Sequence, residues 1–514
     1  VLFRSLLRGH RCITHASRHL AHTSLIQLTV DTSGTRTAIM AATDSPLELD
    51  ATAQAALVRN GAISPIELVD LALARIDTRN PALNAVIHRR DERARADAAA
   101  VDPSAPFAGV PMVLKDLMCE LADEPFHEGM HYLANIDYHA PADQTLARRF
   151  KEAGFVIVGK TNTSELGGVP TTEPLRYGPT HNPWLSGHTP SGSSGGSAAA
   201  VASRMVAIGH ANDAGGSIRS PAARCGLVGL KPSRGRVPLG PLYGDLFGSV
   251  IDELAVTRSV RDTAGLLGAV SGPEPGDPFA VHPSDGVVPR SLRVGVWGGV
   301  PGGFGPLSPE AASAVAVTAD ALSDLGHSVT EAHPPILDRR TAAAVLGKIV
   351  MAGTDWAIRR WERLTGVPCP DDQLEPITRM YVAAAQQLSA TDLLDLAEAG
   401  QLVTRQVAQW YEGFDLLLMA TVAEPPNPHG ELQAFSDDEV DAVMKRVLPS
   451  LSLTSWANLT GQPAISLPIH WADGNVPMGS QLIAAHGRED ILLSVAAELE
   501  IAMPWADRYD LLAF

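Results

Sequence analysis

The chain has 514 residues, 45% of them apolar, which is typical of a globular protein with a large buried core. Its formal net charge of −17 repels phosphate backbones, so we expect no nucleic-acid partner and favour a small neutral or cationic molecule. No run of eighteen uncharged apolar residues occurs, which argues against a membrane partner. The chain has four cysteines, Cys12, Cys119, Cys225 and Cys369, and no two of them form a CxxC pair. This pattern favours a protein of the reducing cytoplasm.

The first 39 residues differ in composition from the rest of the chain. They contain five arginines and four histidines but a single acid, Asp31, as transit peptides do. The first residue is Val1, which instead favours a true start at Met40 preceded by non-native sequence. We therefore treat residues 1–39 as a disordered extension or a non-native start.

Two helices are expected next. Asp50 is a plausible cap before ATAQAALVRN, and Gly61 a plausible stop. Ser64, Pro65 and Glu67 then form a capping box with proline at the first helical position.

Strands and helices alternate in the following part of the chain. Residues 155–159 (FVIVG), 225–231 (CGLVGLK) and 291–297 (SLRVGVW) have the character of short buried strands, and residues 309–326 form an amphipathic helix closed by glycine. This alternation predicts an α/β fold with a parallel or mixed sheet. Residues 330–450 are more helical and are expected to shape a pocket.

Two glycine-flanked serines, Ser193 in GSSGG and Ser217 in AGGSIR, suggest a hydrolase nucleophile built together with backbone donors. A flexible linker is disfavoured by the helix and strand patterns that follow, and neither a P-loop nor GxSxG is present. The base that activates a serine could be His188, His210 or Lys115. Burial of Lys115 would favour the neutral amine, although a lysine at the end of a strand is more often a surface residue.

Three blocks carry a specific resemblance. GVPMVLKD, then NPW with TPSGSSGGSAAAVA, then DAGGSIRSPAARCGLVGLKPS resemble, in order and spacing, the signature of the amidase signature family of amide hydrolases. KTNTSELG, TRSVRDTAGLLGAVSG and NLTGQPAISLPI extend the resemblance over most of residues 45–505. It implies one large α/β domain over residues 40–510, with a mixed twisted sheet covered by helices on both faces, and a possible homodimer.

The resemblance also implies roles for individual residues. Ser217 would be the nucleophile, Ser193 a bridging serine after a cis peptide bond, and Lys115 the base, in a reaction that cleaves an amide through an acyl-enzyme and needs no metal or cofactor. The oxyanion hole would consist of the backbone N–H groups of Ala214, Gly215, Gly216 and Ser217. The expected loop supports are Gly192, Ser194, Asp213 and Arg219, and Arg219 could also face substrate.

One departure from the family pattern is Ser191, which replaces a glycine of the usual GGSSGG. The tract HANDAGGSIRSPAARCGLVGLKPSRGR looks like a branch that contains broad bacterial amidases and 6-aminohexanoate cyclic-dimer hydrolases.

Four alternatives remain at this point. One is a two-lobed solute-binding protein, which short strands such as SLRVGVW suggest but the lack of a convincing export signal disfavours. His127, Glu128 and His131 match the HExxH zinc motif, with Glu152 as a third ligand, but Pro125 and Gly129 disfavour the helix that the motif requires. An A-type subunit of a tRNA-dependent amidotransferase shares the signature, although the acidity of the chain argues against it. Cys225 could be a nucleophile, but its apolar flanks favour a core position.

Overall fold

A computed structural model describes residues 45–244, 249–281, 284 and 287–512. The predicted extension over residues 1–39 lies outside these residues. The capped helices are confirmed: α1 (Ala51–Arg59) has Asp50 as its N-cap, and both hydrogen bonds of the Ser64–Glu67 capping box begin α2 (Pro65–Leu83). Helix α3 (Asp91–Ala100) packs against α2.

One mixed sheet organises the described residues. Its eleven strands are β1 (Val86–Arg89), β2 (Pro111–Lys115), β3 (Val156–Thr161), β4 (Ile208–Asp213), β5 (Val228–Lys231), β6 (Asp252–Thr257), β7 (Arg293–Trp297), β8 (Ser328–Glu331), β9 (Leu416–Ala420), β10 (Ala464–Ala472) and β11 (Val476–Ala484). They lie in the order β1-β3-β2-β4-β6-β5-β10-β11-β9-β7-β8. The pairs of β2 with β3 and β4, and of β7 with β8 and β9, are parallel, and the others are antiparallel.

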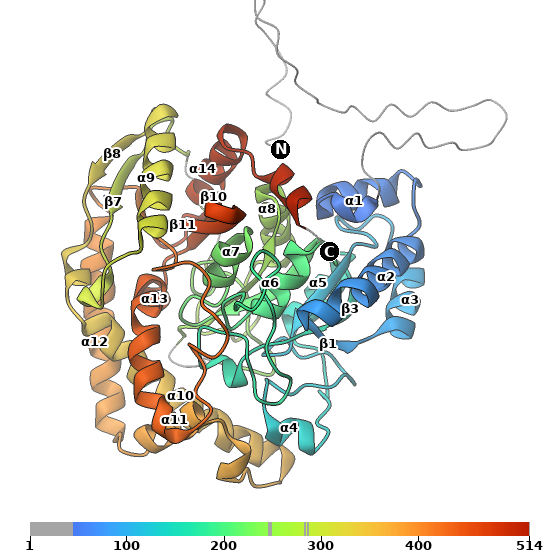
Figure 1. Ribbon diagram of the computed structural model, residues 1–514, viewed down its shortest axis with the longest axis horizontal. Helices are drawn as coiled ribbons and strands as arrows, with labels where there is room; N and C mark the ends of the chain where they lie inside the picture. The colour runs from blue at the N-terminus through green and yellow to red at the C-terminus, as the bar shows by residue number, and fades with distance from the viewer. Residues whose placement is uncertain (1–44, 245–248, 282–283, 285–286, 513–514) are drawn as a thin grey trace, which may run out of the picture.

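Helices cover both faces of this sheet (Figure 1). On one face, α6 (Gly195–Ala202) contacts α7 (Arg219–Cys225), and Ala223 of α7 packs on Gly479 of β11. The next residue, Ser480, points the opposite way and its hydroxyl hydrogen-bonds with Thr318 of α9 (Pro309–Asp324) at 2.7 Å. Three further helices continue the α9 layer: α5 (Thr145–Glu152), α8 (Val260–Val270) and α14 (Glu489–Ala502). The predicted two-sided α/β fold is therefore confirmed.

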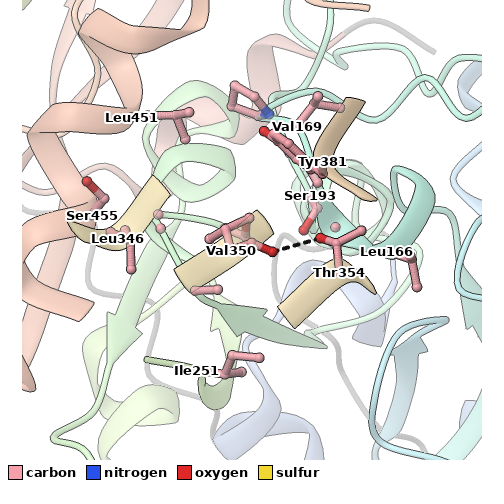
Figure 2. A pocket seen from close by; sticks show the side chains of 18 of the residues that line it. Leu166, Val169, Ser193, Ile251, Leu346, Val350, Thr354, Tyr381, Leu451 and Ser455 are labelled. Atoms are coloured by element: carbon pink, nitrogen blue, oxygen red, sulfur yellow. Dashed lines mark hydrogen bonds between the residues drawn. The ribbon is translucent and has the colours of Figure 1, made fainter. Parts of the chain in front are cut away.

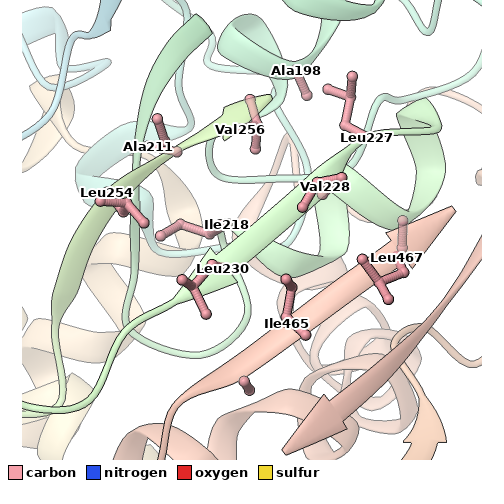
Figure 3. Close-up of a cluster of buried hydrophobic side chains, with 14 of the residues drawn as sticks. Ala198, Ala211, Ile218, Leu227, Val228, Leu230, Leu254, Val256, Ile465 and Leu467 are labelled. Atoms are coloured by element: carbon pink, nitrogen blue, oxygen red, sulfur yellow. The ribbon is translucent and has the colours of Figure 1, made fainter. Parts of the chain in front are cut away.

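The central strands are fixed by an apolar core (Figure 3). Leu254 and Val256 of β6, Leu230 of β5 and Ile465 of β10 are fully buried, as is Ile218, just before α7. Burial of such side chains contributes about 1.5–3 kcal/mol each. The core therefore anchors the segment between β4 and α7, which contains Ser217.

The helical region expected over residues 330–450 consists of α10 (Thr341–Thr365), α11 (Pro376–Ala385), α12 (Ala390–Trp410) and α13 (Val440–Thr460). Within the described residues, α10 alone is long and apolar enough to span a membrane by length and composition. It packs against the other three helices of this region. The short helix α4 (His131–Asn135) lies near them at the lower edge of Figure 1.

Candidate active site

A cavity of about 190 Å³ opens where β2 and β4 end. Apolar side chains of the helical region and of residues 166–170 form most of its wall, and Ser193 points into it (Figure 2). Ser217 also lines this cavity, so the structure brings together the two serines that were singled out in the sequence. The Ser217 hydroxyl is half-buried and makes no hydrogen bond to any described residue.

Lys115, the last residue of β2, lies directly behind Ser193. It is fully buried, so the alternative of a surface lysine is wrong. Its Nζ lies 2.7 Å from Ser193 Oγ and 2.6 Å from Asn212 Oδ1. Burial lowers the pKa of Lys115 to about 7, against a smaller opposing effect of the Asp213 carboxylate. A large fraction of this amine is therefore neutral at physiological pH.

The loop that presents Ser193 contains close backbone contacts. The Gly192–Ser193 peptide bond is cis, and a Cβ atom on Gly192 would lie 2.0 Å from the Thr171 carbonyl oxygen. The Ser194 hydroxyl donates to the Asn212 carbonyl at 3.3 Å. Ser191, the departure from the family pattern, has a φ of 72°, which explains why glycine is usual there.

Asp213, at the end of β4, organises the turn that precedes α7. Its carboxylate accepts hydrogen bonds from the backbone N–H groups of Gly216 at 2.6 Å and Ile218 at 3.1 Å. Burial alone would raise the pKa of Asp213, but Arg219, Lys231 and the hydrogen bond from Asn458 together outweigh burial and hold the pKa well below its usual range. A buried carboxylate thus shapes the loop that carries Ser217.

This arrangement changes the expected oxyanion hole. The Gly216 N–H is directed to Asp213, so it is not free to bind a substrate oxygen. The N–H groups of Ala214, Gly215 and Ser217 make no hydrogen bond to any described residue, and all three residues line the cavity.

Arg219 is a support rather than a substrate contact. Its guanidinium is fully buried, pairs with Asp213 and donates to Asn458 Oδ1 at 2.7 Å and to Gln481 Oε1 at 3.0 Å. It does not line the cavity. The expectation that Arg219 could face substrate is therefore wrong.

Several residues of the site received no role in the sequence analysis. Asn458 donates to both the carbonyl and the carboxylate of Asp213, and Asn212 holds Lys115. A Cβ atom on Gly167 would lie 3.0 Å from Ser193 Oγ. Asn458, Asn212 and Gly167 all belong to tracts that carry the family resemblance, which was the available signal.

The HEGMH segment does not form a zincin helix. His127, Glu128 and Gly129 precede α4, and the positive φ angles of Glu128 and Gly129 break the helical path between the two histidines, as Gly129 predicted. Ligand atoms of His127, His88 and Asp116 do lie within 4.8 Å of one another. However, Lys160 Nζ is 2.6 Å from Asp116 Oδ1, so an ammonium group already supplies the positive charge there.

The other nucleophile and base candidates lie away from the cavity. His210 is fully buried, with its Nε2 atom 3.3 Å from Glu253 Oε1, and its Nδ1 accepts from the Lys115 backbone N–H. His188 does not line the cavity either. Cys225 is a core residue, as expected, and burial raises the pKa of its thiol well above the usual range.

Comparisons with known proteins find amide hydrolases. The Amidase family model matches residues 67–493. The chain is 41% identical over 473 residues to a 6-aminohexanoate-cyclic-dimer hydrolase of Paenarthrobacter ureafaciens, covering 89% of this chain and 96% of the relative. It is 36% identical over 474 residues to the putative amidase AmiC of Mycobacterium tuberculosis, covering 89% and 95%.

Solved structures give the same result. 6-Aminohexanoate cyclic dimer hydrolase complexed with substrate aligns with a TM-score of 0.86 at 39% identity, over 91% of this chain and 99% of that chain. A bacterial aryl acylamidase aligns with a TM-score of 0.81 at 26% identity, again over 91% and 99%.

Proposed function

The chain belongs to the amidase signature family, and we propose that it cleaves a carboxylic acid amide through an acyl-enzyme on Ser217. The products would be an acid and ammonia or an amine. The contact of 2.7 Å between Lys115 Nζ and Ser193 Oγ, at the wall of a cavity that Ser217 also lines, carries this proposal.

The hydrogen bonds around Lys115 suit a neutral amine that acts as a base. The Asn212 side-chain nitrogen donates to the Leu117 carbonyl, which fixes the orientation of the amide and turns its oxygen toward Lys115. A neutral amine has two N–H donors and one lone pair. With one N–H donated to Asn212, the lone pair can accept the Ser193 proton.

In the proposed reaction, Ser193 passes its proton to Lys115 while it accepts the proton of Ser217, whose oxygen attacks the amide carbon. The tetrahedral oxyanion would be held by the N–H groups of Ala214, Gly215 and Ser217. Removal of one such donor costs about 10²- to 10³-fold in rate in other hydrolases, so three donors are a substantial part of catalysis. The protons then return to the leaving nitrogen, and water repeats the sequence on the acyl-enzyme.

We further propose an aliphatic or aromatic amide, linear or cyclic, as the substrate. The cavity wall is mostly apolar, with side chains such as Leu346, Val350 and Leu451, and so suits a hydrocarbon chain. The name of the Paenarthrobacter relative specifies a cyclic dimer of 6-aminohexanoate, which makes cyclic amides the first compounds to assay.

The test is turnover of a panel of aliphatic, aryl and cyclic amides by the purified chain, with and without EDTA. Ser217→Ala should abolish turnover, and Ser323→Ala, on the exposed surface of α9, serves as the matched control. Mass spectrometry of the quenched reaction should find the acyl group on the Ser217 peptide. Equal turnover by wild type and Ser217→Ala would refute the nucleophile. Turnover by the chain alone would also disfavour an amidotransferase subunit, which needs partners and charged tRNA.

A further inference from the structure

A single carboxylate, that of Glu128, occurs among the described residues that line the substrate cavity. The side chain is 4% exposed, in a wall that is otherwise mostly apolar. Several other polar groups of the cavity wall already have hydrogen-bond partners within the protein. The Tyr243 hydroxyl donates to Glu120, and the Thr354 hydroxyl donates to the Val350 carbonyl (Figure 2). An acid is costly in such a place unless it has a partner, so Glu128 calls for an explanation.

The position of Glu128 is fixed from two sides. Trp361 of α10 donates its indole N–H to Glu128 Oε2 at 2.7 Å, and the Leu166 backbone N–H donates to the Glu128 carbonyl at 2.9 Å. Leu166 precedes Gly167, which packs on Ser193. The second carboxylate oxygen, Oε1, accepts no hydrogen bond from any described residue. A rigidly held acceptor is therefore free in the same cavity as the reacting serine.

We propose that Glu128 accepts a hydrogen bond from an N–H group of the substrate that lies away from the scissile bond. Glu128 is then a specificity-determining residue, which selects amides that carry a second N–H donor, either an amide or an ammonium group, over amides of the same length that end in a methyl group. This inference rests on the proposed amide-hydrolase function and specifies which amides the site prefers.

The groups around Glu128 make this preference depend on pH. Burial, with a smaller contribution from the nearby carboxylates of Glu120 and Asp116, raises the pKa of Glu128 to about 7. The Trp361 hydrogen bond and the Arg360 guanidinium, both on α10, oppose the rise. The carboxylate, which is the stronger acceptor, is therefore populated above about pH 7.

Binding tests the inference without turnover. Two pairs of equal length, heptanamide with 6-aminohexanamide and nonanamide with 6-acetamidohexanamide, would be titrated calorimetrically into Ser217→Ala, alone and combined with Glu128→Gln. In these compounds the end group lies on the acyl chain; in a second series of amides, the same end groups lie on the chain of the leaving amine. Glu128→Gln keeps an oxygen for Trp361 but turns an N–H donor toward the cavity. In the series that brings the end group to Glu128, the Glu128→Gln substitution should lower the preference for a donor end group over methyl by about 10- to 100-fold. A loss for the amino compound would show that the site selects an ammonium group, and a loss for the acetamido compound would show that it selects an amide.

Turnover and pH give an independent test. In the Ser217 enzyme, the ratio of kcat/KM for donor-ended to methyl-ended amides should rise with pH through about 7 and become flat in Glu128→Gln. Titration of Lys115 cancels in this ratio, because the same base acts on both substrates. Glu500→Gln is the matched control, because Glu500 also has a pKa raised to about 7 by burial but lies on α14, outside the cavity.

The outcomes are separable. If the preference for a donor end group is the same with and without Glu128→Gln, in both series and in both binding and turnover, the inference is overturned. Ser217-dependent cleavage would still leave the proposed function intact. A Glu128-dependent binding preference without any cleavage would instead support the inference and reject the proposed reaction. Absence of binding by every amide would reject both.

Discussion

The contact between Asn212 and Lys115 allows the proposed base to be tested by its pH dependence. Lys115 should act as a neutral amine, so kcat/KM of the wild type should rise with pH through about 7. Asn212→Asp keeps the shape of the side chain but places a carboxylate oxygen where Asn212 Oδ1 now lies, 2.6 Å from Lys115 Nζ. This negative charge should stabilise the ammonium form and raise the pKa of Lys115.

The size of the effect follows from the distance. An opposite charge within about 4–6 Å typically moves a pKa by about 1 to 3 pH units, or about 1.4–4 kcal/mol of differential stabilisation. The midpoint of the pH–rate profile should move upward by the same amount. At pH 7 the neutral fraction of Lys115 would fall about 5- to 500-fold, and activity should return as the pH is raised toward 10.

The assay is the pH dependence of kcat/KM on a neutral amide, whose own ionisation does not interfere. Asn475→Asp, in the exposed turn between β10 and β11, adds the same charge away from the cavity and should leave the midpoint unchanged. Loss of the Asn212 hydrogen bond to the Leu117 carbonyl will lower the rate at every pH, so the midpoint is the diagnostic quantity. A lower rate with an unchanged midpoint would refute Lys115 as the base.

Three further changes test the surroundings of the site. Gly167→Ala, at a φ of 68°, places a Cβ atom 2.8 Å from Leu117 Cδ2 and 3.0 Å from Ser193 Oγ, so kcat/KM should fall by about 10-fold or more; Gly168→Ala, whose nearest contact is 3.4 Å, should lose much less. Asp213→Asn leaves Arg219 buried without its charge partner and should lower the free energy of unfolding by about 3–5 kcal/mol in chemical denaturation; a change below 1 kcal/mol would contradict the role given to this ion pair. Burial and the Glu375 carboxylate raise the pKa of Glu165 to about 8, so the folded state holds a proton that the unfolded state releases near pH 4.5. Stability therefore falls as the pH rises from about 4.5 to about 8 and stays low above that. Glu165→Gln, which is always neutral, should be more stable than wild type at pH 9 by up to about 5 kcal/mol but not at pH 4, and thermal unfolding at the two pH values measures the difference.

Many of the helices and strands can be predicted from short stretches of sequence, because interactions between nearby residues determine where they begin and end. Asp50 and the Ser64–Glu67 pair cap the helices that they were expected to cap, and the apolar segment over residues 155–159 coincides with β3. These signals act within a few residues. The family resemblance added the residues of the site, which local patterns alone could not select.

The direction of a backbone N–H is not visible in the sequence. The AGGS sequence suggested four converging N–H donors. In the structure, however, the Gly216 N–H donates to the Asp213 carboxylate three residues earlier, and this hydrogen bond closes a tight turn. The supports are harder still to recognise, since Asn458 reaches Asp213 across 245 residues and Gln481 reaches Arg219 across 262. Only tertiary packing brings such partners together.

The choice of Lys115 as the base shows the same limit. Three lysines of the described strands are fully buried, Lys115 on β2, Lys160 on β3 and Lys231 on β5, and their sequence contexts do not distinguish them. Lys160 Nζ lies 2.6 Å from Asp116 Oδ1, and Lys231 Nζ lies 2.8 Å from Asp252 Oδ2, so each of these lysines is paired with a carboxylate.

Among the described residues, the Lys115 side-chain amine hydrogen-bonds only to the neutral side chains of Ser193 and Asn212. Its own neighbour in the chain, Asp116, points to the other side of the strand and pairs with Lys160 instead. Burial without a carboxylate partner favours the neutral amine, and an amine in contact with a serine hydroxyl can accept its proton. The structure thus separates the lysine that can act as a base from two lysines that neutralise buried acids.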